Sequence, residues 1–213
     1  MLSVVIPALN ASATLRDTLA SVADADEVVV VDGGSSDGTA TLAASLGARV
    51  VSAPRGRGSQ LAAGVAAASG DWLLLLHADT RLSRGWRETP LPPDRAGYFR
   101  FTLDSDELRA RRLERLVAWR CRVLALPYGD QGLLIHRDLL AEVGGVRSLP
   151  LMEDVNLVRR LGRRRLVALD VSAITSAEKW RRQGWYRRSL RNLFCLTLYF
   201  AGLPPRLIAR LYG

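Results

Sequence analysis

The first eighty residues alternate short apolar runs with segments of helical spacing. Four valines at 28–31 are typical of a strand buried on both faces, as in a parallel sheet between helices. Similar runs occupy residues 3–6, 49–52 and 72–76. Helical segments begin near residue 12, after residue 38 and at residue 59. This alternation predicts one half of a doubly wound α/β fold.

Beyond residue 93 the pattern changes. Residues 97–103 alternate like a strand with one solvated face, and 106–126 predict a long helix studded with arginine. Short strands are expected at 133–135 and 166–169, and helices from Asp138 and from Met152. The apolar positions of the long helix that we expect in the core are Leu113, Leu116, Val117, Trp119 and Leu124.

Polar side chains follow three of the predicted strands. Asn10, Asp32 and Asp79 each come shortly after an apolar run. The carboxyl ends of parallel strands share one edge of a sheet, where ligands bind. Gly33 and Gly34, followed by Ser35, would let a ligand approach the backbone closely. The pattern favours a nucleotide pocket at this edge, and an ordinary strand-to-helix turn is the alternative for the second strand taken by itself.

The end of the chain differs from the rest. Residues 179–188 mix arginine with aromatic side chains, 193–203 are almost wholly apolar, and 206–212 are basic and amphipathic. This run of eleven residues is too short to cross a bilayer but long enough to lie in its interface. Packing on the domain or in a homodimer explains the same segment equally well.

The amino-acid composition limits the classes of ligand and partner that the chain is expected to bind. The chain has 213 residues, a formal charge of +9 and a single lysine, Lys179, so its positive charge is nearly all arginine. Arginine suits phosphates, carboxylates and anionic membranes, although a bias towards arginine codons would give the same count. No nucleic-acid motif accompanies the charge. Cys121 and Cys195 have no metal-ligand spacing. With no leader or spanning run predicted, we expect a cytoplasmic protein, with the inner face of the membrane as the tail's alternative.

The order of these motifs resembles the family 2 glycosyltransferases of the GT-A fold. Residues 3–10 resemble that family's first strand and nucleotide loop, and 29–39 its uridine-binding strand and turn. His77-Ala78-Asp79 stands where the family has its Asp-x-Asp metal motif. Met152-Glu153-Asp154 stands where it has a Glu-Asp pair with the catalytic base. The whole chain is most similar to the bacterial subgroup called selenodomain-associated transferase 2.

The resemblance implies a Rossmann-like, mostly parallel α/β sheet flanked by helices, with a helical tail. It implies a glycosyltransferase domain over 1–175, with a nucleotide-binding half (1–95) and an acceptor half (96–175), followed by the tail (176–213). Two departures from the family are Ala11, where many relatives have glutamate, and His77, where the first metal-binding aspartate is usual.

The implied reaction transfers a sugar from a UDP- or GDP-sugar to an acceptor hydroxyl, with inversion. Asp79 would hold Mg²⁺ or Mn²⁺, Asp154 would be the general base, and Glu153 would orient or cap beside it. Acids in the first turn of a helix also occur without any chemistry. The acceptor is unknown, and a lipid-linked one would suit the tail. The nucleotide would be held by Pro7, Asn10, Asp32, Gly33, Gly34, Ser35, Arg55, Arg57 and His77, and the acceptor side lined by Asp130, Gln131 and Trp180.

Other classes of protein fit less well. A sugar-nucleotide pyrophosphorylase shares the sheet but needs a glycine-rich basic loop after its first strand, where this chain has Pro7-Ala8-Leu9-Asn10. Neither a dinucleotide-binding glycine motif in the first turn nor a P-loop is present. A non-catalytic basic protein bound at a membrane surface is the alternative outside the enzymes.

Overall fold

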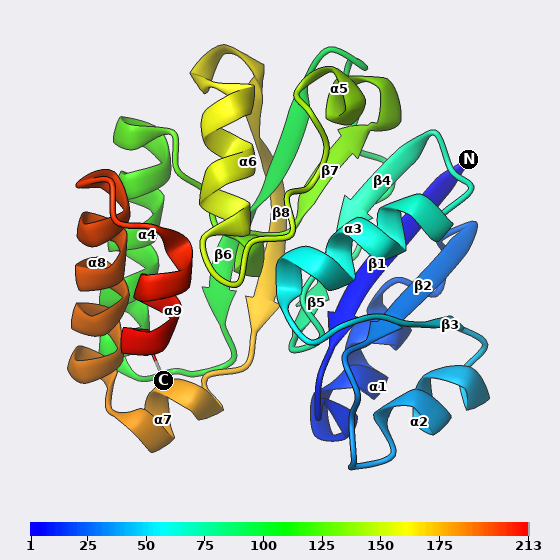
Figure 1. The fold of residues 1–213 in the computed structure, drawn as a ribbon, viewed down its shortest axis with the longest axis horizontal. Coiled ribbons are helices and arrows are strands. Elements are labelled where there is room, and N and C mark those ends of the chain that lie inside the picture. The colour runs from blue at the N-terminus through cyan, green and yellow to red at the C-terminus, as the bar shows by residue number, and fades with distance from the viewer. Residues whose placement is uncertain (213) are drawn as a thin grey trace.

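The computed structural model describes residues 1–212 and is built around one eight-stranded sheet (Figure 1). The strand order is β3-β2-β1-β4-β7-β6-β8-β5. β1 pairs in parallel with both β2 and β4, and β2 pairs in parallel with β3. These four strands are β1 (Leu2–Ala8), β2 (Glu27–Asp32), β3 (Arg49–Ser52) and β4 (Trp72–Leu75).

Alternating side chains of the parallel strands supply two separate cores. Val30 packs with α1 (Ser12–Ser21) and α2 (Thr39–Ser45) on one face of the sheet. Val29 and Val31 pack with α3 (Arg57–Ala67) on the other. The continuous valine run of β2 thus reflects burial on both faces, as the sequence predicts. α3 lies so close that a Cβ on Gly64 would meet Val5 Cγ1 at 2.3 Å.

The second half of the sheet is mixed. β7 (Leu133–His136) is antiparallel to both β4 and β6 (Ala96–Leu103). β8 (Leu166–Thr175) runs parallel to β6, and β5 (Thr80–Leu82) pairs antiparallel with the end of β8. The hydrophobic pattern missed β5 and the final six residues of β8. The remaining helices of this half are α4 (Leu108–Leu124), the 3-10 turns η1 (Gly129–Gln131) and η2 (Arg163–Arg165), α5 (Arg137–Glu142) and α6 (Glu153–Leu161).

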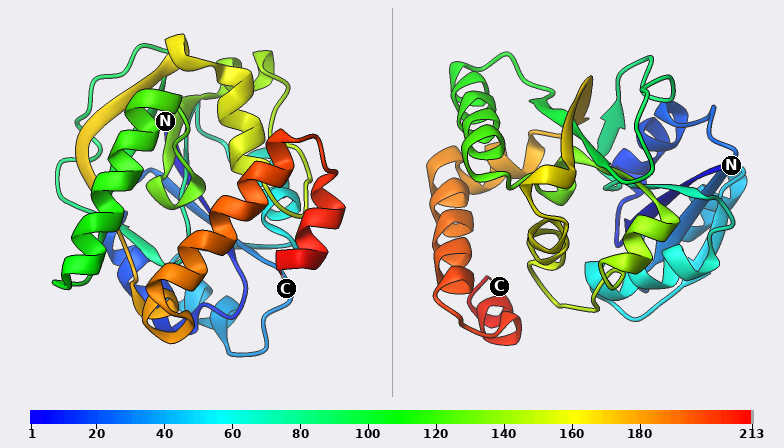
Figure 2. Two further views of the ribbon diagram at one scale, coloured as in Figure 1. Left: turned by 90° about the vertical axis from the view of Figure 1, so that its left-hand side faces the viewer. Right: turned by 90° about the horizontal axis from the view of Figure 1, so that it is seen from above.

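The C-terminal segment packs on the domain with one side. It forms α7 (Glu178–Gln183), α8 (Trp185–Phe200) and α9 (Pro205–Tyr212). Trp180 and Trp185 join a core cluster with β6 and α4, and Leu196 joins one with α6. α8 and α4 run along one edge of the molecule, opposite β3 (Figures 1 and 2). In residues 1–212 no helix combines the length and hydrophobicity required to cross a bilayer.

The prediction for the core of the long helix is only partly correct. Val117 is buried and Leu113 packs against its cluster, but Leu116, Trp119 and Leu124 are 59%, 48% and 48% exposed. The apolar side chains of α4 lie on two sides of the helix, and only one of these sides is buried. One side meets β6 and the tryptophans of the tail, and the other side leaves Leu116 and Trp119 exposed.

Candidate active site

A cleft of about 520 Å³ opens at the carboxyl ends of β1 and β4. Its walls are the loop after β1, the start of α3, the loop after β4 and the segment that enters α7. Gln60 joins two of these elements, because its buried Nε2 donates to Ala8 O and Val31 O, both at 2.8 Å. The lining residues are Pro7, Ala8, Leu9, Asn10, Ala11, Ala13, Thr14, Arg55, Gly56, Arg57, Gln60, His77, Ala78, Asp79, Ser176, Glu178, Lys179 and Arg182.

A second, smaller cavity of about 130 Å³ lies between this cleft and the C-terminal helices. Four side chains, Arg57, His77, Asp79 and Lys179, line both spaces, so the cleft and the cavity meet there. The other walls come from η1, the start of α6 and the inner sides of α7, α8 and α9. They are formed by Tyr128, Asp130, Leu151, Met152, Asp154, Val155, Thr175, Trp180, Arg188, Asn192 and Tyr212.

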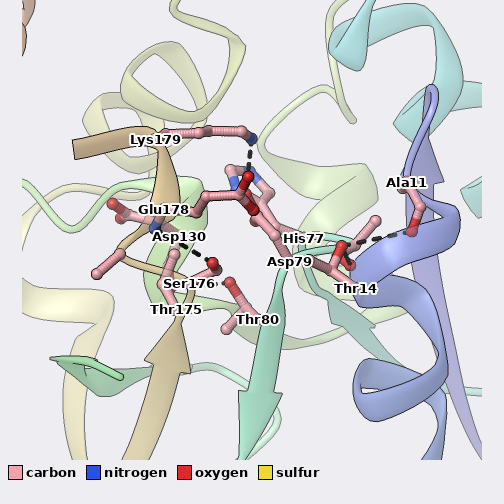
Figure 3. A network of polar contacts seen from close by, with 12 residues as sticks. Ala11, Thr14, His77, Asp79, Thr80, Asp130, Thr175, Ser176, Glu178 and Lys179 are labelled. Carbon is pink, nitrogen blue, oxygen red and sulfur yellow. Dashed lines mark hydrogen bonds and ion pairs between the residues drawn. The ribbon is translucent and has the colours of Figure 1, made fainter. Parts of the chain in front are cut away.

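Asp79 is held at this junction by an ion pair with the only lysine. Lys179 Nζ donates to Asp79 Oδ2 at 2.7 Å (Figure 3). Ser176 N, just after β8, donates to Asp79 O at 3.0 Å and fixes the loop. Burial acts to raise the pKa of Asp79. The charge and hydrogen bond of Lys179, together with other neighbouring groups such as Arg57, outweigh burial and hold this pKa below its usual value. Asp79 is therefore an ionised carboxylate with a resident cation.

His77 is a neutral imidazole at pH 7. Burial, with the charge of Arg57 adding to it, lowers the pKa of His77 to about 4. Arg57 Nη1 donates to His77 Nε2 at 3.3 Å. The ring therefore adds no positive charge to the cleft and leaves Arg57 and Lys179 as the cations nearest Asp79.

Glu153 lies beneath the site and lines neither the cleft nor the second cavity. Its side chain is 1% exposed, and Arg57 Nε lies 2.9 Å from Oε1. Burial raises the pKa of Glu153 to about 7; Arg57 opposes the shift and Asp154 adds to it. The expectation that Glu153 orients a neighbour is consistent with this pairing, because it fixes Arg57 at the junction.

Asp154 faces the second cavity from the first turn of α6. Met152, with φ of 64°, adopts the left-handed conformation directly before the helix. Asp154 Oδ2 accepts from Gly129 N at 2.8 Å, and Oδ1 accepts from Val155 N at 2.7 Å. A Cβ on Gly129 would meet His77 Nε2 at 2.5 Å, so only glycine allows η1 to lie this close to both side chains.

Two of the three residues expected on the acceptor side line the second cavity, and one does not. Asp130 and Trp180 line the second cavity. Asp130 Oδ1 is buried without a hydrogen-bond partner, and burial raises the pKa of this side chain to about 6. Gln131 was predicted to line the cavity and does not. It is 2% exposed, and its amide bridges Tyr128 N to Phe99 O, which makes it a structural residue of η1.

Of the predicted nucleotide contacts, Pro7, Asn10, Arg55, Arg57 and His77 line the cleft, while the residues of the second strand's turn do not. Asp32 is 7% exposed and accepts from the backbone of Gly34 and Ser35, so its carboxylate closes its own turn. Gly33 packs against Gln60. Ser35 Oγ accepts from Asn10 N at 2.9 Å, which ties this turn to the lining loop. Residues 32–35 therefore contact the residues that line the cleft and do not line it themselves.

Sequence reasoning missed several lining residues from the C-terminal helices. Lys179, Arg188, Asn192 and Tyr212 reach the second cavity from three different helices. The one available signal was that Lys179 is the only lysine in the chain. Within residues 1–212 no three His, Cys, Asp or Glu side chains are grouped so that they could hold a metal ion by themselves.

Known proteins share both the motifs and the fold. Residues 3–92 match the model of the family described as Glycosyl transferase family 2. An uncharacterized glycosyltransferase of Mycobacterium tuberculosis is 42% identical over 84 residues, which are 39% of this chain and 38% of that relative. The glucosyl-3-phosphoglycerate synthase of the same organism is 37% identical over 92 residues, covering 37% of this chain and 28% of the relative. The alignments thus span less than two fifths of these relatives.

Solved structures extend the likeness beyond residues 3–92. Glucosyl-3-phosphoglycerate synthase from Mycobacterium tuberculosis, in complex with Mn²⁺ and UDP-glucose, aligns with 81% of this chain and 69% of its own. Its TM-score is 0.60 at 24% identity. The sheet, its flanking helices and the cleft at the strand ends therefore define the GT-A class of glycosyltransferase folds. Residues 3–92, which are 90 of the 213 residues, resemble glycosyl transferase family 2.

The burial of Glu153 predicts a pH-dependent stability. Its pKa rises from an ordinary 4.5 to about 7 in the folded chain, so the folded state binds this proton more tightly than the unfolded state. The free energy of unfolding should therefore decrease as the pH rises between these values. Glu153→Gln, which stays neutral, should gain stability relative to the parent between pH 5 and pH 8, by on the order of 1–3 kcal/mol.

Denaturant unfolding at both pH values measures this difference. Glu142→Gln is the matched control, because Glu142 is also paired with an arginine, Arg165, but is 61% exposed. An equal effect of Glu153→Gln at both pH values would contradict the prediction.

Proposed function

We propose that the chain transfers a sugar from a UDP-sugar to a hydroxyl group of an acceptor. The observation that carries this proposal is the meeting of the cleft and the second cavity at Asp79 and its three neighbours. One space has the volume for a nucleotide sugar, and the other contains a carboxylate suited to proton transfer. The solved relative that binds UDP-glucose with Mn²⁺ supports the choice of donor.

The donor would occupy the cleft, with its base against the loop after β1 and its diphosphate towards Arg57 and Lys179. Arg55 and Arg182 also line the cleft, which therefore contains four cationic side chains and only two acids, Asp79 and Glu178. This excess suits a diphosphate, since arginine and lysine make charge-assisted hydrogen bonds to phosphate oxygens.

The residues at the junction fit a divalent cation that the donor helps to hold. Asp79 offers a partly exposed carboxylate, and Mg²⁺ or Mn²⁺ accepts oxygen ligands from carboxylates and phosphates together. His77, being neutral, could add a nitrogen ligand. When bound, the cation would neutralise charge on the leaving diphosphate. Lys179 would have to release Asp79 Oδ2 first, and its flexible side chain could then contact the phosphates.

In the proposed mechanism, Asp154 is the general base. The acceptor hydroxyl would enter the second cavity and donate its proton to Asp154 as its oxygen attacks the anomeric carbon. The bond from that carbon to the diphosphate oxygen breaks in the same step, and UDP leaves with the electron pair. A single displacement from the opposite face inverts the anomeric configuration. Gly129 N–H and Val155 N–H hold the carboxylate in place.

A donor-binding experiment tests the proposal. Isothermal titration with UDP-, GDP- and dTDP-sugars, with and without Mn²⁺, should give binding for a UDP-sugar that Asp79→Ala weakens at least about tenfold, the loss expected of a charged contact. Asp94→Ala is the matched control, because Asp94 is an exposed acid outside both spaces. Absence of binding to any nucleotide sugar, or an equal effect of the two variants, would overturn the assignment.

A further inference from the structure

The helices α4 and α8 lie along one edge of the molecule (Figure 2). Both expose large apolar side chains, and α4 also exposes arginines. On α8, Leu190 is 65% and Phe194 is 56% exposed. On α4, Trp119 and its neighbours are exposed in the same way. We name this surface the outer face, and its members are Arg112, Arg115, Leu116, Trp119, Arg122 and Val123 of α4 with Tyr186, Leu190, Leu193, Phe194 and Thr197 of α8.

Helical spacing places these residues on one side of each helix. Each member from α8 lies three or four residues from another member, and the same holds for those from α4. The opposite side of α8 is already used, because Trp185 and Leu196 pack in the core. The outer face is therefore what remains after the tail has packed on the domain.

The positive charge near the outer face indicates which kind of partner it would bind. The stretch 179–213 contains eight of the chain's 30 basic residues and none of its 21 acidic residues. Nearly all of the net charge of +9 thus belongs to this tail. Several of these basic residues, such as Lys179 and Arg188, line the second cavity and do not belong to the outer face. The charge of the outer face itself comes from Arg112, Arg115 and Arg122 of α4, which are all exposed. Residues 115–127 of α4 and its following turn also contain arginine and no acid. A surface that combines exposed aromatics with unneutralised arginine is complementary to an anionic, amphipathic partner.

We propose that the outer face docks on an anionic lipid bilayer surface. Trp119, Tyr186 and Phe194 would enter the boundary between headgroups and acyl chains, where aromatic side chains are favoured. The arginines of α4 would contact acidic headgroups. Pairing of two outer faces would bring their arginines together without acids to neutralise them, so a second copy fits this surface less well. Because no described helix can span the bilayer, the contact is peripheral.

Docking in this way would place the second cavity near the membrane. α8 has the outer face on one side and contributes Arg188 and Asn192 to the cavity on the other. Arg188 Nε and Asn192 Oδ1 are buried without hydrogen-bond partners. Because α8 would lie between the bilayer and the cavity, a lipid-linked acceptor would have to pass an edge of α8 to bring its hydroxyl to Asp154. This second step rests on the proposed transferase function, whereas the docking itself does not.

Co-sedimentation with vesicles tests the docking. The full chain should bind vesicles of phosphatidylcholine that contain a substantial share of anionic phosphatidylglycerol at low salt, because an anionic surface attracts arginine. It should bind pure phosphatidylcholine at least about tenfold more weakly, and high salt should release it. Each arginine near an anionic surface adds about fivefold to affinity, so the triple variant Arg112→Gln/Arg115→Gln/Arg122→Gln should bind about 10²-fold more weakly.

The control removes the same charge elsewhere. Arg16→Gln/Arg81→Gln/Arg84→Gln replaces three exposed arginines outside the outer face and should leave vesicle binding nearly unchanged. Leu193→Ser/Phe194→Ser should weaken binding even at low salt, and thermal unfolding confirms that each variant is folded. UDP-sugar titration of the same variants should be unaffected, so failure of docking is distinguishable from failure of the transferase assignment.

Three results would overturn the proposal. They are absence of binding to the anionic vesicles at low salt, equal losses in the outer-face and control triple variants, and a stable dimer that Leu193→Ser/Phe194→Ser dissociates. The last result, measured by light scattering, would assign the outer face to a second copy of the chain.

Discussion

Asp154→Asn should lower the rate of sugar transfer by about 10²–10⁴-fold while leaving UDP-sugar affinity nearly unchanged. The amide has the shape of the carboxylate, and its oxygen can still accept from Gly129 N. It cannot take a proton from the acceptor hydroxyl. The loss should therefore appear in kcat for transfer, because Asp154 lines the second cavity and not the donor cleft. Single-turnover transfer and donor titration measure the two quantities separately.

The chain provides a matched control for this substitution. Asp138 occupies the first turn of α5 as Asp154 occupies the first turn of α6, but its side chain is 90% exposed. If Asp154 served only to stabilise its helix end, Asp154→Asn and Asp138→Asn would both change thermal stability modestly and neither would change turnover. Full turnover in Asp154→Asn would remove Asp154 from the role of base.

Lys179→Met should tighten Mn²⁺ binding by about tenfold or more in the presence of UDP. Lys179 Nζ occupies an oxygen of Asp79, the carboxylate that would hold the cation. The Lys179 ammonium and the cation would repel each other. Two unit charges about 4 Å apart at an effective dielectric constant of about 20 repel by about 4 kcal/mol. This energy is larger than the free energy of a tenfold change in affinity. Methionine keeps the length of the side chain and removes its charge. Electron paramagnetic resonance of free Mn²⁺ measures the affinity directly.

The same variant should have the opposite effect without metal. If Lys179 supplies a cation to the diphosphate, Lys179→Met should weaken metal-free UDP binding. Arg181→Met is the control, since Arg181 lies on the same helix, loses the same charge and lines neither space. Unchanged Mn²⁺ affinity in Lys179→Met would mean that the ion pair with Asp79 does not compete with the metal.

Local pattern was sufficient for much of the fold. The valine run of β2 required helices on both faces of the sheet, and the structure has them. Strand ends carried Asn10 and Asp79 to one edge, where both line the cleft. Asp32 is instructive, since an aspartate followed by two glycines and a serine can close its own turn by accepting backbone hydrogen bonds. Short-range chemistry of this kind competes with ligand binding for the same carboxylate.

Other features depended on contacts that no local pattern contains. The bond between Lys179 and Asp79 joins residues 100 apart in the chain. Gln131 is polar in sequence, yet its burial follows from β6 passing beside η1. Periodicity showed which residues of α4 share a side, but not which side the tail would cover.

The sequence by itself therefore determined most of the strands and helices, the strand-end acids and the charge of the tail, because these follow from neighbouring residues and composition. Tertiary structure alone decided which acids share a space, which cation accompanies Asp79, and which apolar side chains stay exposed. The physical reason is that burial and ion pairing are properties of surfaces brought together by folding, and the partner surface of each residue lies far from it in the chain.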